Sequence, residues 1–177
     1  MRTIPLTGKR AAGRVTLIDD QDFDLVSQYR WNFFELVRPA GRSCGPYARA
    51  IFRLDGVRKH MFMHTLITGY AQTDHADNDG LNNQRSNLRP ATALQNKANQ
   101  RPRSDQVYSQ YKGVFRVRKG HRQRWGARVS VNGHRHELGY YDDEEMAARA
   151  YDAAALAAWG EYAWLNFPVT NASPAAG

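Results

Sequence analysis

Apolar and polar side chains alternate along three segments in the second half of the chain. Residues 113–118, 125–131 and 135–141 each carry the period-two pattern that is typical of strands with one buried face. Asn132-Gly133, between the second and third segments, is a strong signal for a two-residue hairpin. The pattern therefore predicts a three-stranded antiparallel sheet.

The period of the pattern changes directly after this sheet. Asp142-Asp143 offers an N-cap, and Glu144-Glu145 suits the positive end of a helix. Apolar side chains then recur at helical spacing from Met146 to Ala154, and Gly160 predicts the end of the helix. We expect this helix to lie across the sheet.

The first half of the chain carries shorter elements. Asp55-Gly56 lies between two strand-like segments and is a type I′ hairpin signal. The expected strands are 14–18, 47–54 and 58–64, and the expected short helices lie within 22–29 and 64–69. Together with the second half, these elements predict an α+β fold with a strand-rich N-terminal region.

A polar stretch separates the two halves. Residues 100–106 contain one proline and no apolar side chain, which is typical of a linker. We therefore expect a first domain over residues 1–100, a linker over 101–108, a second domain over 109–168 and a flexible tail over 169–177.

Basic residues outnumber acidic residues, 25 against 17, which gives a net charge of +8. The excess is concentrated in residues 101–141, where ten basic and two acidic residues are interleaved with Tyr111, Phe115 and Trp125. A folded surface of this charge is typical of proteins that bind a polyanion, and nucleic acid is the first candidate.

Three other classes of protein are not supported. No apolar run approaches the roughly 20 residues of a membrane helix, and the N-terminus lacks the apolar region of a signal peptide. The single cysteine, Cys44, cannot form an internal disulfide or a multi-cysteine zinc site. We expect a monomeric cytoplasmic protein with no membrane partner and no protein partner.

Residues 74–89 form an unusually polar segment. Three carboxylates, one histidine and four asparagines lie between Asp74 and Asn87. An EF-hand register with Gly80 at its sixth position puts His75 at the first and Ser86 at the twelfth, so this calcium loop is excluded.

A short helix is expected after this polar segment. Thr92 and Gln95 form a capping box, which places Asn96 on that helix. The expected order is a strand with Asp74-His75, a long loop, a second strand, and the helix with Asn96.

Asp74-His75, Asn87 and Asn96 at this spacing resemble the HNH nuclease motif, the ββα-metal fold. The flanking segments 18–31, 63–67 and 79–89 are similar to the phage and bacterial homing-endonuclease branch of that family. The resemblance covers most of residues 1–100, with the ββα-metal motif at about 60–100. The last motif position is asparagine and not histidine, so the pattern is H-N-N.

This resemblance implies hydrolysis of DNA phosphodiester bonds. His75 would be the general base, and Asn87 would hold the loop so that the His75 ring is aimed. Asp74 and Asn96 would bind one divalent cation, Mg²⁺ or Mn²⁺, through oxygen. A single site of this type cuts one strand, so a monomer should nick double-stranded DNA in a bacterial or phage-infected cell.

A second resemblance is carried by residues 109–168, through the segments 111–114, 125–127, 138–139, 147–155 and 165–168. They are similar to the plant ethylene-response-factor (APETALA-type) DNA-binding domain, in which a three-stranded sheet lies in the major groove. Phe115 and Glu137 depart from the usual Arg and Trp, so the plant target sequence is not transferred. The expected DNA contacts are Arg116, Arg118, Trp125, Arg128 and Arg135, joined by Arg85 or Arg89 from the first half.

These features predict a site-selective DNA endonuclease targeted by a basic sheet. One alternative is a non-catalytic DNA-binding protein or transcription regulator derived from such a nuclease, which would bind DNA without metal-dependent cleavage. A structural metal-binding protein without nucleic-acid function is a third hypothesis, and the basic block argues against it. Salt separates the third hypothesis from the others, because binding to phosphates weakens steeply as salt rises.

Overall fold

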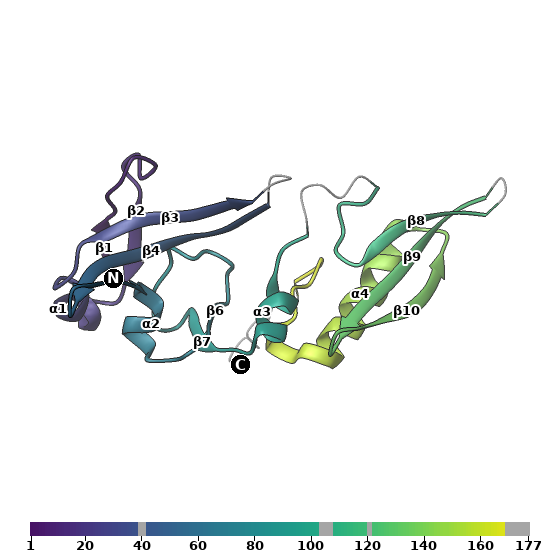
Figure 1. The fold of residues 1–177 in the computed structure, drawn as a ribbon. Helices are drawn as coiled ribbons and strands as arrows, with labels where there is room; N and C mark the ends of the chain where they lie inside the picture. The colour runs from purple at the N-terminus through teal and green to yellow at the C-terminus, as the bar shows by residue number, and fades with distance from the viewer. Residues whose placement is uncertain (39–41, 103–107, 120–121, 169–177) are drawn as a thin grey trace, which may run out of the picture. The chain divides into compact units, whose positions relative to one another are not determined.

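The computed structural model describes residues 1–38, 42–102, 108–119 and 122–168, so the predicted tail and most of the predicted linker lie outside the described residues. The chain forms two compact units, Met1–Ala93 and Leu94–Gly177. Helices and antiparallel strands occur in both units, and the predicted α+β class is confirmed (Figure 1). The first unit ends at Ala93, whereas composition alone suggested a domain boundary at residue 100.

The first unit contains a short strand pair and a three-stranded sheet. The pair is β1 (Arg2–Pro5) with β2 (Val15–Ile18), and the sheet has the order β3 (Trp31–Arg38), β4 (Arg42–Leu54), β5 (Val57–Phe62). Asp55 and Gly56 join β4 to β5 with φ values of 52° and 76°. The predicted hairpin is therefore confirmed, because a type I′ turn requires positive φ at both positions.

Short helices connect these strands to a small hairpin. They are η1 (Asp20–Asp22), α1 (Phe23–Val26) and α2 (Met63–Thr68), and the hairpin pairs β6 (Thr73–His75) with β7 (Leu88–Pro90). Gly69 ends α2 with φ 71°, the left-handed conformation in which glycine has no Cβ penalty.

The core of the first unit forms around Trp31, which is 1% exposed. Ile18, Val26 and Met63 pack in the same buried cluster and are fully buried. Trp31 Nε1 donates a hydrogen bond to the Val26 carbonyl at 2.9 Å, so the indole is buried without an unpaired N–H. This cluster fixes α1 and α2 against the sheet.

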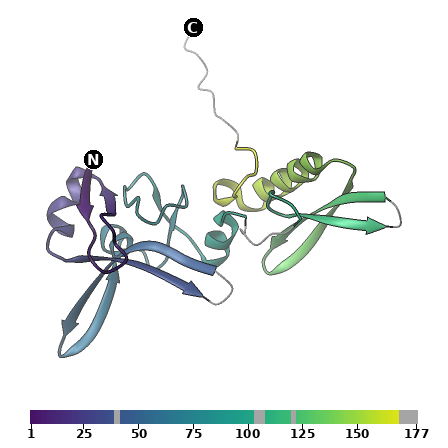
Figure 2. The ribbon, with the colours of Figure 1, turned by 90° about the horizontal axis from the view of Figure 1, so that it is seen from above.

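The second unit is a three-stranded antiparallel sheet covered by one helix. Its elements are α3 (Ala93–Asn99), β8 (Val114–Lys119), β9 (Arg122–Val131), β10 (His134–Tyr141), α4 (Glu144–Trp159) and η3 (Gly160–Tyr162). The strand order is β10-β9-β8, and Figure 2 shows α4 lying along one face of this sheet. The predicted strands, hairpin and helix are confirmed.

Small side chains bring α4 close to the sheet. Ala147 and Ala148 are fully buried against Val114 and Ala127. Gly113 has φ 79°, and a Cβ there would lie 2.0 Å from the Tyr151 ring, so this position requires glycine for both conformation and space.

The pattern did not predict β1 and β3. The segment Trp31–Arg38 carries consecutive apolar side chains and lacks the alternation of a half-buried strand. Pairing with β4, from Trp31 opposite Ala50 onward, determines its strand conformation.

No helix within the described ranges is both long and apolar enough to cross a membrane.

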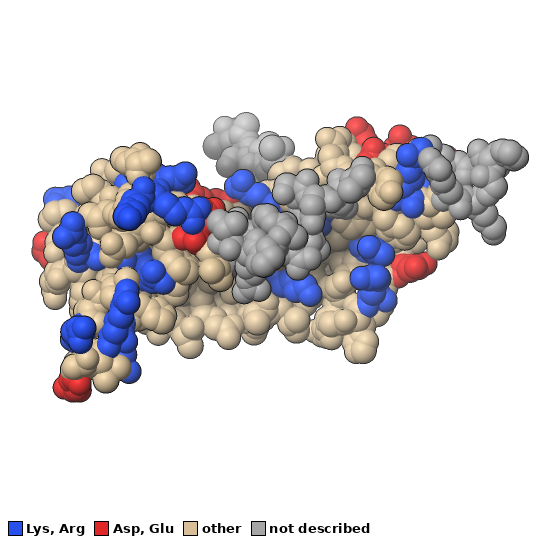
Figure 3. Space-filling view, turned by 45° about the horizontal axis from the view of Figure 1, so that its top comes forward, with Lys and Arg blue, Asp and Glu red and all other residues tan. Residues whose placement is uncertain are grey.

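Lys and Arg side chains are spread over the face drawn in Figure 3, with fewer acidic side chains among them.

Candidate functional site

The β6–β7 hairpin places the predicted catalytic dipeptide in the interior of the first unit. Asp74 pairs with Arg89 in the strand register, and His75 pairs with Leu88. Asp74 is 5% exposed and His75 is 6% exposed. The predicted order of strand, loop and strand around Asp74-His75 is confirmed.

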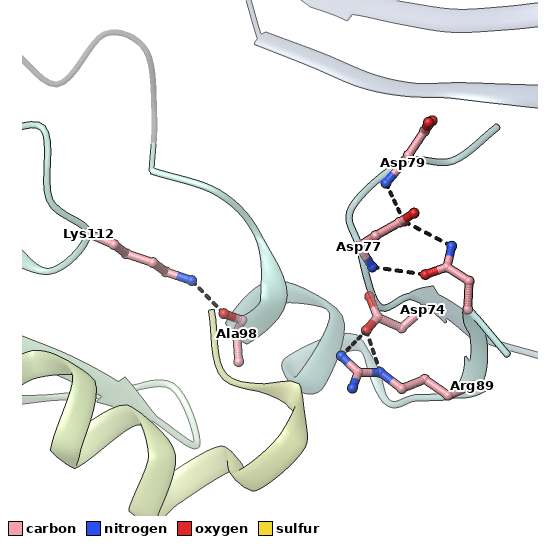
Figure 4. A network of polar contacts seen from close by, with 7 residues as sticks. Asp74, Asp77, Asp79, Arg89, Ala98 and Lys112 are labelled. Atoms are coloured by element: carbon pink, nitrogen blue, oxygen red, sulfur yellow. Dashed lines mark hydrogen bonds and ion pairs between the residues drawn. The ribbon is translucent and has the colours of Figure 1, made fainter. Parts of the chain in front are cut away.

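Asn87 closes the loop that connects β6 to β7. Its Oδ1 accepts the Asp77 N–H at 3.0 Å, and its Nδ2 donates to Asp77 Oδ1 at 2.9 Å and to the Asn82 carbonyl at 2.8 Å. Asp77 Oδ1 also accepts the Asp79 N–H at 2.8 Å (Figure 4). One carboxamide thus fastens both ends of the loop that follows His75, and its role in catalysis stays a prediction.

A directional chain of hydrogen bonds leads from the core to the His75 ring. The Thr16 hydroxyl donates to the Leu81 carbonyl at 2.6 Å, so it can only accept from Asn83, whose Nδ2 lies 2.8 Å away. Asn83 Oδ1 therefore faces His75 Nε2, at 3.4 Å. An oxygen acceptor at Nε2 favours the neutral tautomer with its proton on Nε2 and its lone pair on Nδ1.

Aromatic rings enclose His75 on another side. The His64 ring lies edge-on to it with centroids 5.1 Å apart, and the Tyr47 ring lies at 5.9 Å. Phe62 stacks on His64 at 5.4 Å with an interplanar angle of 6°. Gly80 permits this packing, because a Cβ there would meet the Tyr47 ring at 2.6 Å.

Burial lowers the pKa of both histidines. For His64 the pKa falls from 6.5 to about 3, through burial first and then the neighbouring His75. The pKa of His75 is also lowered by burial, against the opposing effects of the Asn83 hydrogen bond and of the nearby carboxylates, led by Asp77. Both imidazoles are therefore neutral at neutral pH.

Arginines pair with carboxylates close to this hairpin. Arg89 Nε and Nη2 both contact Asp74 Oδ2, at 2.9 and 2.7 Å (Figure 4). Arg85 forks onto Asp22, with Nη2 2.7 Å from Oδ1 and Nε 2.9 Å from Oδ2. Both arginines hold the fold together, and a contact of either with DNA phosphate stays a prediction.

The second predicted metal ligand, Asn96, lies on α3. From Leu94 onward this helix belongs to the second unit, whereas Asp74 belongs to the first. A shared cation site of Asp74 and Asn96 therefore stays a prediction.

The predicted DNA contacts of the second unit divide between the two faces of its sheet. Arg116 lies opposite Trp125, and cross-strand partners share a face. Trp125 packs against the buried cluster beneath α4, so both residues lie on the helix-covered side. Arg128 extends over the Phe115 ring on the other face, with its guanidinium carbon 4.6 Å from the ring centroid.

Arg135 lies on the same open face as Arg128. Its partner in the register is Ser130, two positions from Arg128 on β9. Burial and the nearby Arg135 lower the pKa of Arg128, which also indicates a shared basic surface. Arg118 belongs to β8, and its side chain lies outside the described part of the chain.

Sequence reasoning missed three residues around His75, namely Thr16, Asn83 and Tyr47. Thr16 and Asn83 are fully buried, and Tyr47 and His64 supply the flanking rings. Asn83 stood within the polar segment, but no local pattern connected it with Thr16, 67 residues away.

In the second unit, sequence reasoning also missed Arg124. Its side chain is half-exposed on β9, on the face of Arg128, and it contacts Asp142 at 3.1 Å.

Comparison with known proteins gives relatives of two kinds. An uncharacterized HNH endonuclease of Acanthamoeba polyphaga mimivirus is 32% identical over 162 residues, covering 89% of this chain and 77% of that protein. An AP2-like ethylene-responsive transcription factor of Arabidopsis thaliana is 53% identical over 47 residues, covering 27% of this chain and 11% of that protein.

A third relative supports the second of these similarities. An AP2/ERF and B3 domain-containing protein of Oryza sativa subsp. japonica is 49% identical over 70 residues, covering 40% of this chain and 18% of that protein. The chain therefore spans less than a fifth of each of these plant proteins. No protein-family model matches the chain. The viral relative matches most of both sequences, and on that similarity the chain belongs to the HNH endonuclease family.

Proposed function

We propose that this protein is a site-selective endonuclease that hydrolyses phosphodiester bonds of double-stranded DNA, with His75 as general base and one divalent cation. The observation that carries the proposal is the arrangement of His75. Its ring is buried in the β6–β7 hairpin, and Asn83 and Thr16 determine its orientation. A buried, rigidly held imidazole beside a carboxylate is an arrangement suited to proton transfer.

The His75 ring would take a proton from the attacking water. The chain of hydrogen bonds through Asn83 favours a lone pair on Nδ1, so Nδ1 would accept the proton while the water oxygen attacks phosphorus. The bond from phosphorus to the 3′ oxygen then breaks. Asn87 keeps the loop after His75 in place, which supports its assignment as a positioning residue.

Asp74 and Asn96 would hold the cation, Mg²⁺ or Mn²⁺. Carboxylate and amide oxygens are the donors that these hard cations prefer. When bound, the cation would polarise the phosphate and stabilise charge on the leaving oxygen. The contact with Arg89 orients the Asp74 carboxylate.

The sheet of the second unit would hold the DNA. Arg128 and Arg135 share its open face, and similarity to AP2/ERF proteins supports this role. Arginine can fork onto guanine O6 and N7 in the major groove. The proposed contacts are therefore Arg128 and Arg135, with Arg118 of β8 and with Arg85 or Arg89 from the first unit. Arg116 and Trp125, which the sequence also suggested, lie on the helix-covered side and not on this face.

Nicking of a supercoiled plasmid tests the proposal. The plasmid should carry DNA from around the native gene, and the assay should compare Mg²⁺, Mn²⁺ and chelator. We expect metal-dependent nicking that falls about 100-fold or more in His75→Ala, because a positioned general base contributes at least that much. His60→Ala, which changes an exposed histidine on β5, is the matched control and should nick like the wild type.

A non-catalytic DNA-binding protein is the second candidate, and the basic open face of the β8–β10 sheet favours it. This alternative predicts DNA binding whose affinity falls steeply with salt, since each phosphate contact contributes about −0.9 to the slope of log K against log salt. If the protein binds DNA in this salt-dependent way but cleaves it in neither Mg²⁺ nor Mn²⁺, the nuclease proposal is refuted and the alternative is supported.

A further inference from the structure

Helix α3 is attached to the second unit through its C-terminal end. The helix has seven residues, Ala93–Asn99, and an isolated helix of that length is unstable in water. Its last carbonyls have no partner within the helix and need donors from elsewhere. The Ala98 carbonyl accepts the Trp164 N–H at 3.2 Å, from the segment that follows α4.

Lys112 supplies the principal donor at this helix end. Its ammonium donates to the Ala98 carbonyl (Figure 4) and, at 2.7 Å, to the Gln100 carbonyl. A cation at this position also compensates the negative end of the helix dipole. Burial lowers the pKa of the ammonium to about 8, so it remains charged at neutral pH. A half-buried lysine directed at two backbone carbonyls is a capping group, whereas a surface charge would extend into solvent.

The backbone of Lys112 is fixed by the rest of the second unit. Its N–H donates to Asn166 Oδ1 at 2.7 Å, and its carbonyl accepts from Asn166 Nδ2 at 3.1 Å. Asp152 of α4 in turn accepts the Asn166 N–H at 2.8 Å and the Phe167 N–H at 2.8 Å. A continuous set of hydrogen bonds therefore leads from α4 to the end of α3.

We infer that Lys112 is a positioning residue: it connects α3, and with it Asn96, to the sheet and α4 of the second unit. This inference rests on the proposed function, in which Asn96 is a cation ligand. Asn96 lies two residues before Ala98, in the turn whose carbonyl end Lys112 holds. The orientation of the Asn96 amide oxygen is thus coupled to the sheet unit that would bind the DNA.

Amide hydrogen exchange of the metal-free full-length protein tests the structural step. Lys112→Met keeps the aliphatic length of the side chain and removes the ammonium. We expect the amides of α3 to exchange about tenfold faster or more, since hydrogen bonds to charged groups are among the stronger ones. Lys97→Met removes an exposed lysine from the same helix and should change this exchange little. Unchanged exchange in Lys112→Met would overturn the inference.

The concentration of Mn²⁺ needed for half-maximal nicking tests the positioning step. We expect it to rise about tenfold in Lys112→Met, the scale found when partners of metal ligands are removed. DNA affinity without metal should stay unchanged. Faster α3 exchange with an unchanged Mn²⁺ requirement would overturn the positioning role.

Two further results keep the outcomes distinct. If the wild type does not nick DNA with any metal tested, the proposed function fails, and the role of Lys112 in positioning a cation ligand fails with it. The amide exchange of α3 still reports separately on whether Lys112 caps the helix. If Lys112→Met does not fold, the ¹⁵Nζ spectrum of the wild type decides the structural step. A slowly exchanging Lys112 ammonium is expected there, and its absence would overturn the inference.

Discussion

His64 provides the sharpest quantitative prediction, because its imidazole is buried among rings. Phe62 stacks on it, and Tyr47 and His75 lie edge-on at 5.5 and 5.1 Å. Its pKa in the folded protein is about 3, against 6.5 when unperturbed. As pH falls below 6.5, the unfolded chain binds a proton that the folded chain does not bind, so acid favours unfolding.

The size of this effect follows from the two pKa values. Linkage gives a loss of about 2 kcal/mol in the free energy of unfolding between pH 7.5 and pH 5, rising to about 5 kcal/mol below pH 3. We expect His64→Phe, which keeps an aromatic ring and removes the titrating group, to lack this loss. The free energy of unfolding of His64→Phe minus that of the wild type should therefore be about 2 kcal/mol larger at pH 5 than at pH 7.5.

Urea unfolding at several pH values, followed by the methyl signal of Met63, measures this difference. Met63 is fully buried in the core of the first unit, so its signal reports on that unit alone. His75 also has a lowered pKa, and its contribution largely cancels because both proteins contain it. His60→Phe makes the same replacement at an exposed position of β5 and serves as the control for the change of histidine to phenylalanine. Parallel curves for wild type and His64→Phe would refute the buried, neutral state of His64.

Three further substitutions test other contacts. Thr16→Val removes the acceptor of Asn83 Nδ2, so the ¹⁵N shifts of His75 should change from those of one tautomer to those of a mixture. The free energy of unfolding should fall by about 1–3 kcal/mol. An unchanged single tautomer would contradict the hydrogen-bond chain. Asn87→Ala removes three hydrogen bonds and should lower the urea stability of the first unit by about 3 kcal/mol, whereas a loss below about 1 kcal/mol would show that the loop is held otherwise. Arg89→Gln removes the ion pair of the buried Asp74 carboxylate and should cost about 3 kcal/mol in the same assay, so full stability would argue against a strong pair.

Local chemistry along the chain determined the turns and helix ends. Asp55-Gly56 and Asn132-Gly133 both form hairpins with positive φ values, because few other residue pairs tolerate that conformation. Asp143 Oδ1 accepts the Met146 N–H at 2.9 Å at the start of α4, and Gly160 follows its last residue. These features depend on neighbouring residues only, so the sequence alone predicted them.

The sequence also determined that Asp74 and His75 end a strand of a small hairpin. The polar composition of the loop and the spacing to Asn87 and Asn96 are sufficient to indicate the motif. The alternation of the β8–β10 strands identified a basic sheet. It did not separate Arg116 from Arg128, because the assignment of faces depends on the strand register and on the side that α4 covers.

Only the tertiary structure decided the surroundings of the motif. Thr16 reaches Asn83 because β2 packs beside the loop, and the burial of His64 depends on rings from β4 and β5. The contact of Lys112 with α3 likewise connects a residue in the turn before β8 with a helix residue 14 positions earlier. Hydrogen-bond direction and burial arise where distant segments meet, and no local sequence pattern records which segments those are. The sequence therefore determined the motif and its elements, and the packing of those elements decided how the motif residues are oriented and charged.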